Sequence, residues 1–150
     1  MKREHDKYIK SRNLTFAESK PISGKTQKYF NYAHQAALKS SYGKIRHGAV
    51  LVKGGSVLSY GFNKDKFSSF AKKFRCEHMG PATSHAEIDC LLGIPRKKTV
   101  GATIYVVRIN QDGQLRLSKP CPMCHAALKH CGIKKVVYST NDGQAEMYKL

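Results

Sequence analysis

Two motifs with metal-binding side chains constrain the fold of this chain more than any other feature. The first, in TSHAEIDCLL, holds His85 and Glu87, and the second, in KPCPMCHAALKHCG, holds Cys121 and Cys124. Each motif stands at the start of a short stretch with helical character. Because helix N-termini at one edge of a β-sheet can converge on a single point, an α/β fold can bring the two motifs together.

The order of the predicted elements agrees with such a fold. A helix is expected from Thr26, which would cap it, until Gly43 breaks it. A hairpin should follow, with strands Ala49–Val52 and Val57–Tyr60 around Gly54-Gly55, and then a short helix that Ser84 caps and that runs to Leu92. Next we expect the strand ATIYVVRI, a turn at Asp112-Gly113 and a returning strand QLRL. The last elements are a second short helix, from just after Pro120 to Gly132, and the strand IKKVVYS. A helix joins the last two strands of this series, so we expect them to be parallel within a mixed sheet.

Length and composition restrict the class of protein. The 150 residues, of which 41% are apolar, suit a basic arm over 1–25 and a single domain over 26–150. No stretch reaches the ~20 apolar residues that a membrane span needs, and the N-terminus MKREHDKYIK lacks the apolar run of a secretory signal. We therefore expect an intracellular protein, cytoplasmic or nuclear, that is neither secreted nor bound to a membrane. Its five cysteines, an odd number, do not suggest a complete disulfide framework.

The net charge points to an anionic partner. The chain has 27 Lys and Arg against 10 Asp and Glu, a formal charge of +17, and such an excess attracts nucleic acid. The stretch FNKDKFSSFAKKFR interleaves aromatic and cationic residues, which suits single-stranded nucleic acid. Its members are Phe62, Phe67, Phe70 and Phe74 with Lys64, Lys66, Lys72, Lys73 and Arg75. In the alternative interpretation, Phe67, Phe70 and Phe74 are the core stripe of an amphipathic helix. The lysines would then form a basic face that Arg96, Lys97, Lys98, Lys134 and Lys135 extend.

The two motifs together supply the ligands of a zinc ion. Imidazole and thiolate are natural zinc ligands, and a catalytic zinc takes three protein ligands and keeps one position open for water. His85, Cys121 and Cys124 would be those ligands, and Cys121 lies near a helix N-terminus that favours the thiolate. Zinc lowers the pKa of such a water to about 7, and Glu87 can act as its general base.

Other uses of these residues remain open at this point. A closed structural site would need a fourth ligand. Helical geometry turns His125 away from the site and displaces Cys131 along the helix axis, so Cys90 and His78 are the remaining candidates. Cys76 and His78 could hold a second metal. Cys90 and Cys131 also suit small buried apolar positions, and a Cys-x-x-Cys pair can serve redox chemistry.

HAE followed by PCPMC resembles the zinc-dependent cytidine/deoxycytidylate deaminase superfamily. The resemblance runs from about Tyr29 to Ser139 and includes HGAVLVKGGSVLSYGFN, GATIYVV and GIKKVVYS. It implies a three-layer α-β-α fold, zinc as the cofactor, and the zinc ligands named above. It further implies that Glu87 moves a proton from water to the ring nitrogen, that Asn63 hydrogen-bonds the base or sugar, and that the backbone of Ala86 faces the leaving amino group.

GIKKVVYS resembles the branch of the superfamily with a parallel final strand pair, which includes deoxycytidylate, tRNA adenosine and polynucleotide cytidine deaminases. The loop from Asn63 to His85 is longer than in bacterial tRNA adenosine deaminases, and no C-terminal helix precedes Leu150. Both departures weigh against adenosine as the substrate.

The expected function is deamination of cytosine in single-stranded DNA or RNA, because a monophosphate does not require so large a positive charge. The alternatives are a free (d)CMP deaminase, a tRNA adenosine deaminase, and an inactive zinc-folded RNA-binding module. Glu87 argues against the inactive module, since a structural site has no use for it. Relatives of this kind are commonly oligomers, so a homo-oligomer is also an expectation.

Overall fold

The computed structural model describes residues 20–75 and 81–150. The elements are α2 (Gly24–Ala37), β1 (Arg46–Lys53), β2 (Ser56–Phe62), β3 (Lys64–Phe67), α3 (Ser69–Lys72), β4 (Thr83–Ser84), α4 (Ala86–Leu91), α5 (Arg96–Thr99), β5 (Thr103–Ile109), β6 (Leu115–Arg116), α6 (Pro122–His130), β7 (Lys135–Ser139) and β8 (Ala145–Lys149). None of the helices in these two ranges is long and apolar enough to cross a membrane.

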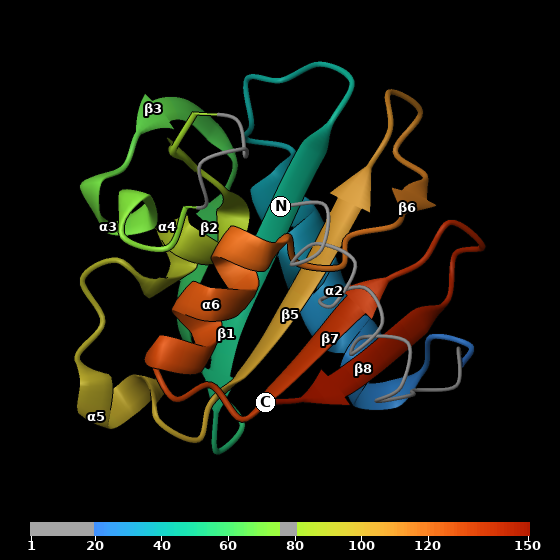
Figure 1. Cartoon of the computed structure of the whole chain (residues 1–150). Helices are drawn as coiled ribbons and strands as arrows, with labels where there is room; N and C mark the ends of the chain where they lie inside the picture. The colour runs from blue at the N-terminus through green and yellow to red at the C-terminus, as the bar shows by residue number, and fades with distance from the viewer. Residues whose placement is uncertain (1–19, 76–80) are drawn as a thin grey trace.

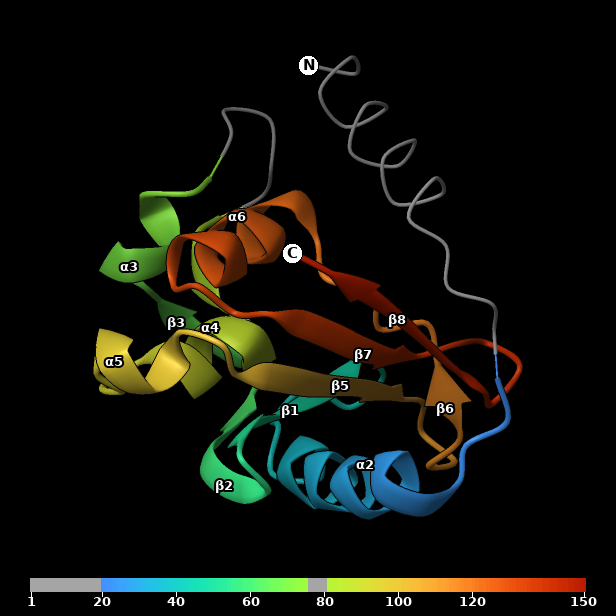
Figure 2. The ribbon, with the colours of Figure 1, turned by 90° about the horizontal axis from the view of Figure 1, so that it is seen from below.

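A six-stranded mixed sheet forms the middle layer of the fold. Its strand order is β2-β1-β5-β7-β8, with β6 paired to β5, while β3 and β4 form a separate small sheet. Helix α2 covers one face of the large sheet, and α4 and α6 cover the other (Figures 1 and 2). This is the three-layer α-β-α fold that the sequence predicts.

The alternation of side chains along the central strands builds a core on each face of the sheet. In β1, Ala49 and Leu51 pack with α4 and α6, whereas Val50 and Val52 pack with α2. Because both faces are covered, the central strands read as continuous apolar runs. The two helices that carry the metal-type motifs therefore share one face of the sheet.

The predicted hairpin and the predicted parallel pair are confirmed. Strands β1 and β2 are antiparallel around Gly54 and Gly55, both of which have positive φ. Strands β5 and β7 are parallel, with Ile104 opposite Val136. The chain then continues into β8, antiparallel to β7, a strand that the sequence analysis did not predict. This additional pair, β7 with β8, is antiparallel, whereas the pair that the sequence predicts to be parallel, β5 with β7, is parallel.

The predicted helix boundaries need correction. Helix α2 begins at Gly24 with Ser23 as its N-cap, so Thr26 is not the cap. It ends at Ala37, well before Gly43, and the chain then turns where the Ser40 hydroxyl donates to a backbone carbonyl. Helix α4 is capped at His85 rather than Ser84. A propensity for capping does not select between neighbouring candidates, and tertiary contacts make that choice.

Candidate zinc site and the residues around it

Three potential ligand atoms meet between α4 and α6. His85, Cys121 and Cys124 each offer one atom, and all three atoms lie within 4.8 Å of one another. The Nδ1 atom of His85 is 3.5 Å from the sulfur of Cys121 and 3.4 Å from that of Cys124. The prediction that the two motifs form one site is confirmed.

Helix starts position all three ligands. His85 is the N-cap of α4, and Cys121 is the N-cap of α6, where Pro122 occupies the first turn. The Cys121 sulfur accepts a hydrogen bond from the backbone N–H of Cys124 at 3.5 Å. Helix N-termini favour anionic groups, so this end of α6 suits a thiolate.

The spacing of the three atoms fits zinc. Ligand atoms at the usual zinc distances of a tetrahedral site lie about 3.5 Å apart, as the His85 nitrogen and the two sulfurs do. Hydrogen bonding from Cys124, and also from His85, lowers the pKa of the Cys121 thiol to about 4. Burial raises the pKa of Cys124, so its proton has to leave when the metal binds.

Glu87 lies in the first turn of α4, beside this site. Its side chain is buried, with 4% exposed. Burial raises the pKa of Glu87 to about 7, and the charge of Cys121 adds to this effect, while His85 opposes it. A buried carboxyl group with a raised pKa beside a metal site is a candidate acid–base group.

Gly61 allows α4 to lie directly on β2. A Cβ atom at this position would stand 2.2 Å from the carbonyl oxygen of Ala86 and 2.6 Å from the nitrogen of Cys90. Both are backbone atoms, so only glycine permits this approach. The fully buried Ala86, the first residue of α4, thereby lies against β2.

Asn63 joins the end of β2 to the start of β1. Its side-chain oxygen accepts from the backbone N–H of His47 at 2.9 Å, and its side-chain nitrogen donates to the carbonyl of Ile45 at 2.9 Å. These bonds tie the backbone after β2 to the start of β1. The substrate contacts that the resemblance implies for Asn63 and Ala86 remain predictions.

His47 is a further candidate for the site, and the sequence analysis did not identify it. It lies opposite Arg108 in the β1–β5 pair, and alternation places both side chains on the face of α4 and α6. Burial, and after it the charges of Arg108 and His85, lower the pKa of His47 to about 4. The only signal in the sequence is its position directly before the Gly48-Ala49-Val50 start of a buried strand.

The basic stretch after β2 divides into two kinds of residue. Lys66, Lys72, Lys73 and Arg75 are exposed. Lys64 instead pairs with Asp89 at 3.0 Å and lies over the Phe62 ring. The predicted contacts of all five with nucleic acid remain predictions.

The phenylalanines do not form one helical stripe. Phe70 and Phe74 pack against the core, 5.2 Å apart between ring centroids, as the helical interpretation requires. Phe67 is 63% exposed and lies in β3, so that interpretation is wrong for this residue. The chain is still extended at Phe67, because the helix begins only after its cap at Ser68.

Cys90, Cys131 and His125 do not belong to the ligand cluster found among residues 20–75 and 81–150. Cys90 and Cys131 are buried, as the apolar interpretation predicts. The side chain of His125 stacks on Tyr148. The proposed second metal site at Cys76 and His78 lies outside the described residues.

Comparison with known proteins agrees with this geometry. Residues 23–140 match the family described as the cytidine and deoxycytidylate deaminase zinc-binding region. The apo dCMP deaminase of cyanophage S-TIM5 is 25% identical, with a TM-score of 0.52 over 77% of this chain and 82% of that one. A cytidine deaminase from Burkholderia pseudomallei is 20% identical, with a TM-score of 0.58 over 82% of this chain and 91% of that one. A search of curated proteins found no match.

The family match covers most of the chain, and the ligand cluster has the nitrogen and sulfur donors that zinc prefers. This chain therefore belongs to the cytidine and deoxycytidylate deaminase family of zinc-dependent hydrolases.

Proposed function

We propose that the substrate is a free cytosine mononucleotide, dCMP or CMP, which the enzyme converts to the uracil nucleotide. The likeness to the phage dCMP deaminase carries this proposal, because it joins sequence identity to a shared fold. The proposal thus replaces the polynucleotide substrate that the charge alone favours.

Arg108 supports a substrate that carries a phosphate. Its Nε atom is buried and has no hydrogen-bond partner in the described part of the chain. It lies at the carboxyl end of β5, directly across from His47, whose pKa responds to the charges of both Arg108 and His85. A guanidinium group is suited to phosphate. We assign Arg108 to the phosphate and the neutral His47 to the sugar between phosphate and base.

Glu87 would carry the protons of the reaction. When bound, zinc supplies a water molecule whose pKa is lowered to about 7. Glu87 takes one proton from this water and places it on ring nitrogen N3, while the oxygen attacks C4. The second proton then goes to the amino group through Glu87, and the C4–N bond breaks to release ammonia. Cytosine and water are thus converted to uracil and ammonia.

The test is a substrate panel followed by mass spectrometry. The zinc-loaded protein is incubated with dCMP, CMP, cytidine, a cytosine-containing oligodeoxynucleotide and tRNA. We expect conversion of the mononucleotides with a higher kcat/KM than that of cytidine. Conversion of the oligonucleotide alone would contradict the proposal, and conversion of adenosine in tRNA would overturn the base assignment.

A matched pair of variants tests the phosphate contact. Arg108→Gln should lower kcat/KM for dCMP about 10- to 100-fold, the usual value of a hydrogen bond to a charged group, and should leave cytidine nearly unchanged. Arg116→Gln is the control, because Arg116 lies opposite Arg108 in the β5–β6 pair but is exposed. Equal losses on dCMP and cytidine in Arg108→Gln would show that Arg108 does not recognise the phosphate.

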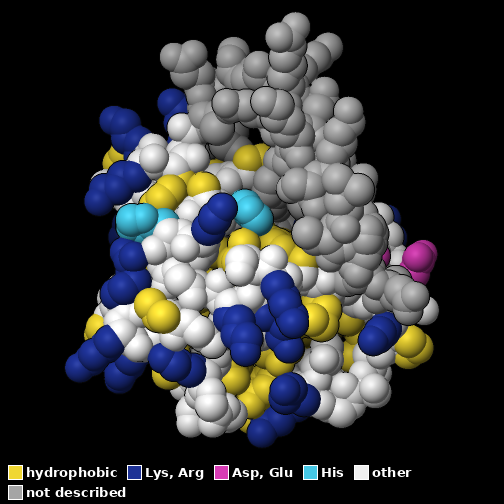
Figure 3. Space-filling model, turned by 60° about the horizontal axis from the view of Figure 1, so that its bottom comes forward, with side chains coloured by type: hydrophobic (Ala, Val, Ile, Leu, Met, Phe, Trp, Pro, Cys, Tyr) yellow, Lys and Arg dark blue, Asp and Glu magenta, His cyan; other side chains and the backbone are white. Residues whose placement is uncertain are grey.

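Cytosine in single-stranded nucleic acid is the second candidate, and the charge of the folded domain favours it. Residues 1–19 contain 5 of the 27 Lys and Arg and 3 of the 10 Asp and Glu, so +15 of the +17 comes from residues 20–150. Lysine and arginine are spread over the face seen in Figure 3, where few acidic side chains are visible. Lys25, Lys134 and Lys149 are close enough to Lys135 to lower its pKa further, after burial. Such a surface attracts a polyanion.

A further inference from the structure

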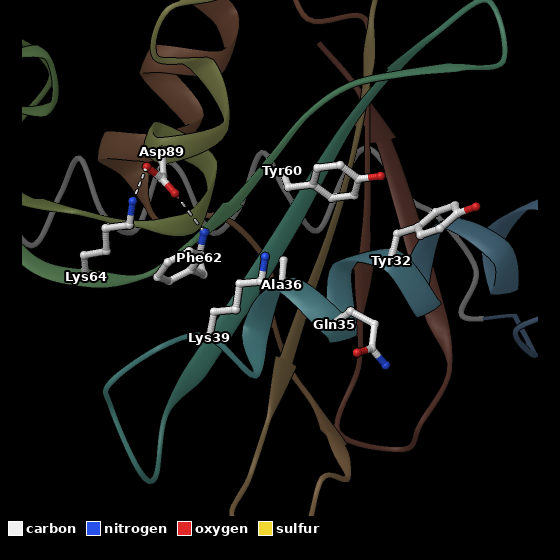
Figure 4. A pocket seen from close by; sticks show the side chains of 8 residues that line it. All are labelled: Tyr32, Gln35, Ala36, Lys39, Tyr60, Phe62, Lys64 and Asp89. Carbon is white, nitrogen blue, oxygen red and sulfur yellow. Dashed lines mark hydrogen bonds and ion pairs between the residues drawn. The ribbon is translucent and has the colours of Figure 1, made fainter.

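A surface pocket at the edge of the sheet has a lining unlike that of the zinc site. It lies between α2, the edge strand β2, and the start of β3, and its volume is about 500 Å³ (Figure 4). This is within the range of about 300–1,000 Å³ for small-molecule sites. None of the three zinc ligands lines it, and neither does Glu87.

Aromatic rings form one side of the pocket. Tyr32 from α2 and Tyr60 from β2 meet edge-to-face, with centroids 6.2 Å apart. They are 40% and 53% exposed, which is high for large aromatic side chains beside one another. Phe62 follows on the same strand and also lines the pocket. Exposed aromatic rings in a concavity are suited to stacking with a flat ligand.

Cationic and amide side chains form the other side. Gln35 lies in the last turn of α2 and Lys39 in the turn that follows this helix, and neither has a side-chain hydrogen-bond partner in the described part of the chain. Figure 4 shows the Lys39 side chain extending from the end of this segment toward β2. Asp89 is the one acidic lining residue, and Lys64 at 3.0 Å and the backbone N–H of Phe62 at 3.1 Å already engage it. Lys39 is thus the cation available to an anionic ligand.

We propose that this pocket binds one nucleotide unit, with its base against Tyr32 and Tyr60 and its phosphate beside Lys39. Gln35 has both a donor and an acceptor for the edge of the base. A free nucleotide and a nucleotide within a single strand have this chemistry in common. The proposal does not depend on which substrate reaches the zinc site.

Charge distinguishes this occupant from a second copy of the chain. The pocket lining has two lysines and one aspartate, so a two-fold contact over this face would bring two net positive linings together. Such a contact also requires a large apolar area, whereas lysine, glutamine and aspartate share this pocket with the aromatic rings. A nucleotide instead complements both the rings and the charge.

The test uses a short, fluorescently labelled oligothymidylate and dTMP with the zinc-loaded full chain. Thymine has no exocyclic amine, so its binding is independent of deamination. Tyr60→Ala should weaken oligothymidylate binding about fivefold or more, the value of one base stacked on an aromatic ring. Tyr60→Phe should retain the binding, because the ring remains.

A charge-matched pair completes the experiment. Lys39→Ala should weaken binding more than Lys98→Ala, which removes an exposed lysine on α5, outside the pocket.

Loss of dTMP binding in Tyr60→Ala would identify a free nucleotide as a ligand. Binding of the oligonucleotide alone, sensitive to the same change, would identify a strand. Equal affinities of Tyr60→Ala and the wild type, or of the two lysine variants, would overturn the proposal. A changed sedimentation coefficient in Tyr60→Ala with unchanged binding would assign the face to a second copy.

Discussion

The protonation of His47 links the site to the stability of the fold. Burial and the charges of Arg108 and His85 lower its pKa from 6.5 to about 4. Between these values the unfolded chain binds a proton that the folded protein does not. The stabilisation is therefore complete above pH 6.5 and is lost as the pH falls toward 4.

Replacing His47 with Gln should remove this pH dependence. Between pH 6.5 and about 5, the wild type should lose roughly 2 kcal/mol of unfolding free energy more than the variant loses. Urea denaturation of both zinc-loaded proteins at several pH values measures the difference. The same pH slope in both proteins would contradict the assigned cause.

Individual ligands could be predicted from the sequence because their chemistry is local to two motifs. Thiolate and imidazole groups at helix starts indicate zinc without knowledge of the fold, and His85, Cys121 and Cys124 do lie together. His47 could not be identified in this way, because its place opposite Arg108 depends on the pairing of β1 with β5. The same applies to Lys64, since its partner Asp89 is far away in the sequence.

Among the elements, the position of α4 depends on its contact with β2. Gly61→Ala would force a Cβ atom against the backbone of Ala86 and Cys90, so the helix must move. We expect a loss of about 1–3 kcal/mol in unfolding free energy, with reduced activity because Glu87 moves with α4. Gly43→Ala is the control, since nothing lies within 4 Å of its Cβ position. Urea midpoints that agree between the two variants would contradict the close packing.

The phenylalanines of β3 and α3 offer a second comparison. Phe70→Ala should cost about 3 kcal/mol because the ring packs against the core, whereas Phe67→Ala should cost less than about 1 kcal/mol because the ring is 63% exposed. Thermal and urea unfolding of both variants measure the costs. If Phe67→Ala is as costly as Phe70→Ala, the division of this segment into strand and helix is wrong.

Most elements could be predicted because their patterns are strong. The Gly54-Gly55 turn and the buried runs on either side indicate the hairpin, which the structure has. Strand β8 was missed because AEMYK has no β-branched residue and buries only Ala145 and Tyr148. The Asp142-Gly143 pair, a turn signal, was the one indication that the chain would return.

For the whole molecule, the salt dependence of binding distinguishes attraction of a polyanion by the basic surface from binding of one phosphate at Arg108. Binding of a single-stranded oligonucleotide should weaken steeply as salt rises, because each phosphate contact releases counterions. The KM for dCMP should rise only slightly, since one phosphate is involved. Titrations at several NaCl concentrations measure both effects. A KM for dCMP as salt-dependent as oligonucleotide binding would show that the whole basic surface, rather than Arg108, attracts the mononucleotide.

The most direct test of the account is the conversion of dCMP by zinc-loaded wild-type protein and by Glu87→Gln, with zinc content measured in both. We predict that both proteins hold one zinc ion and that the wild type releases dUMP and ammonia. Glu87→Gln should be slower by about 10²–10⁴, the range of a general acid–base group. A variant that is as active as the wild type, or a zinc-loaded wild type that leaves dCMP unchanged, would contradict the account.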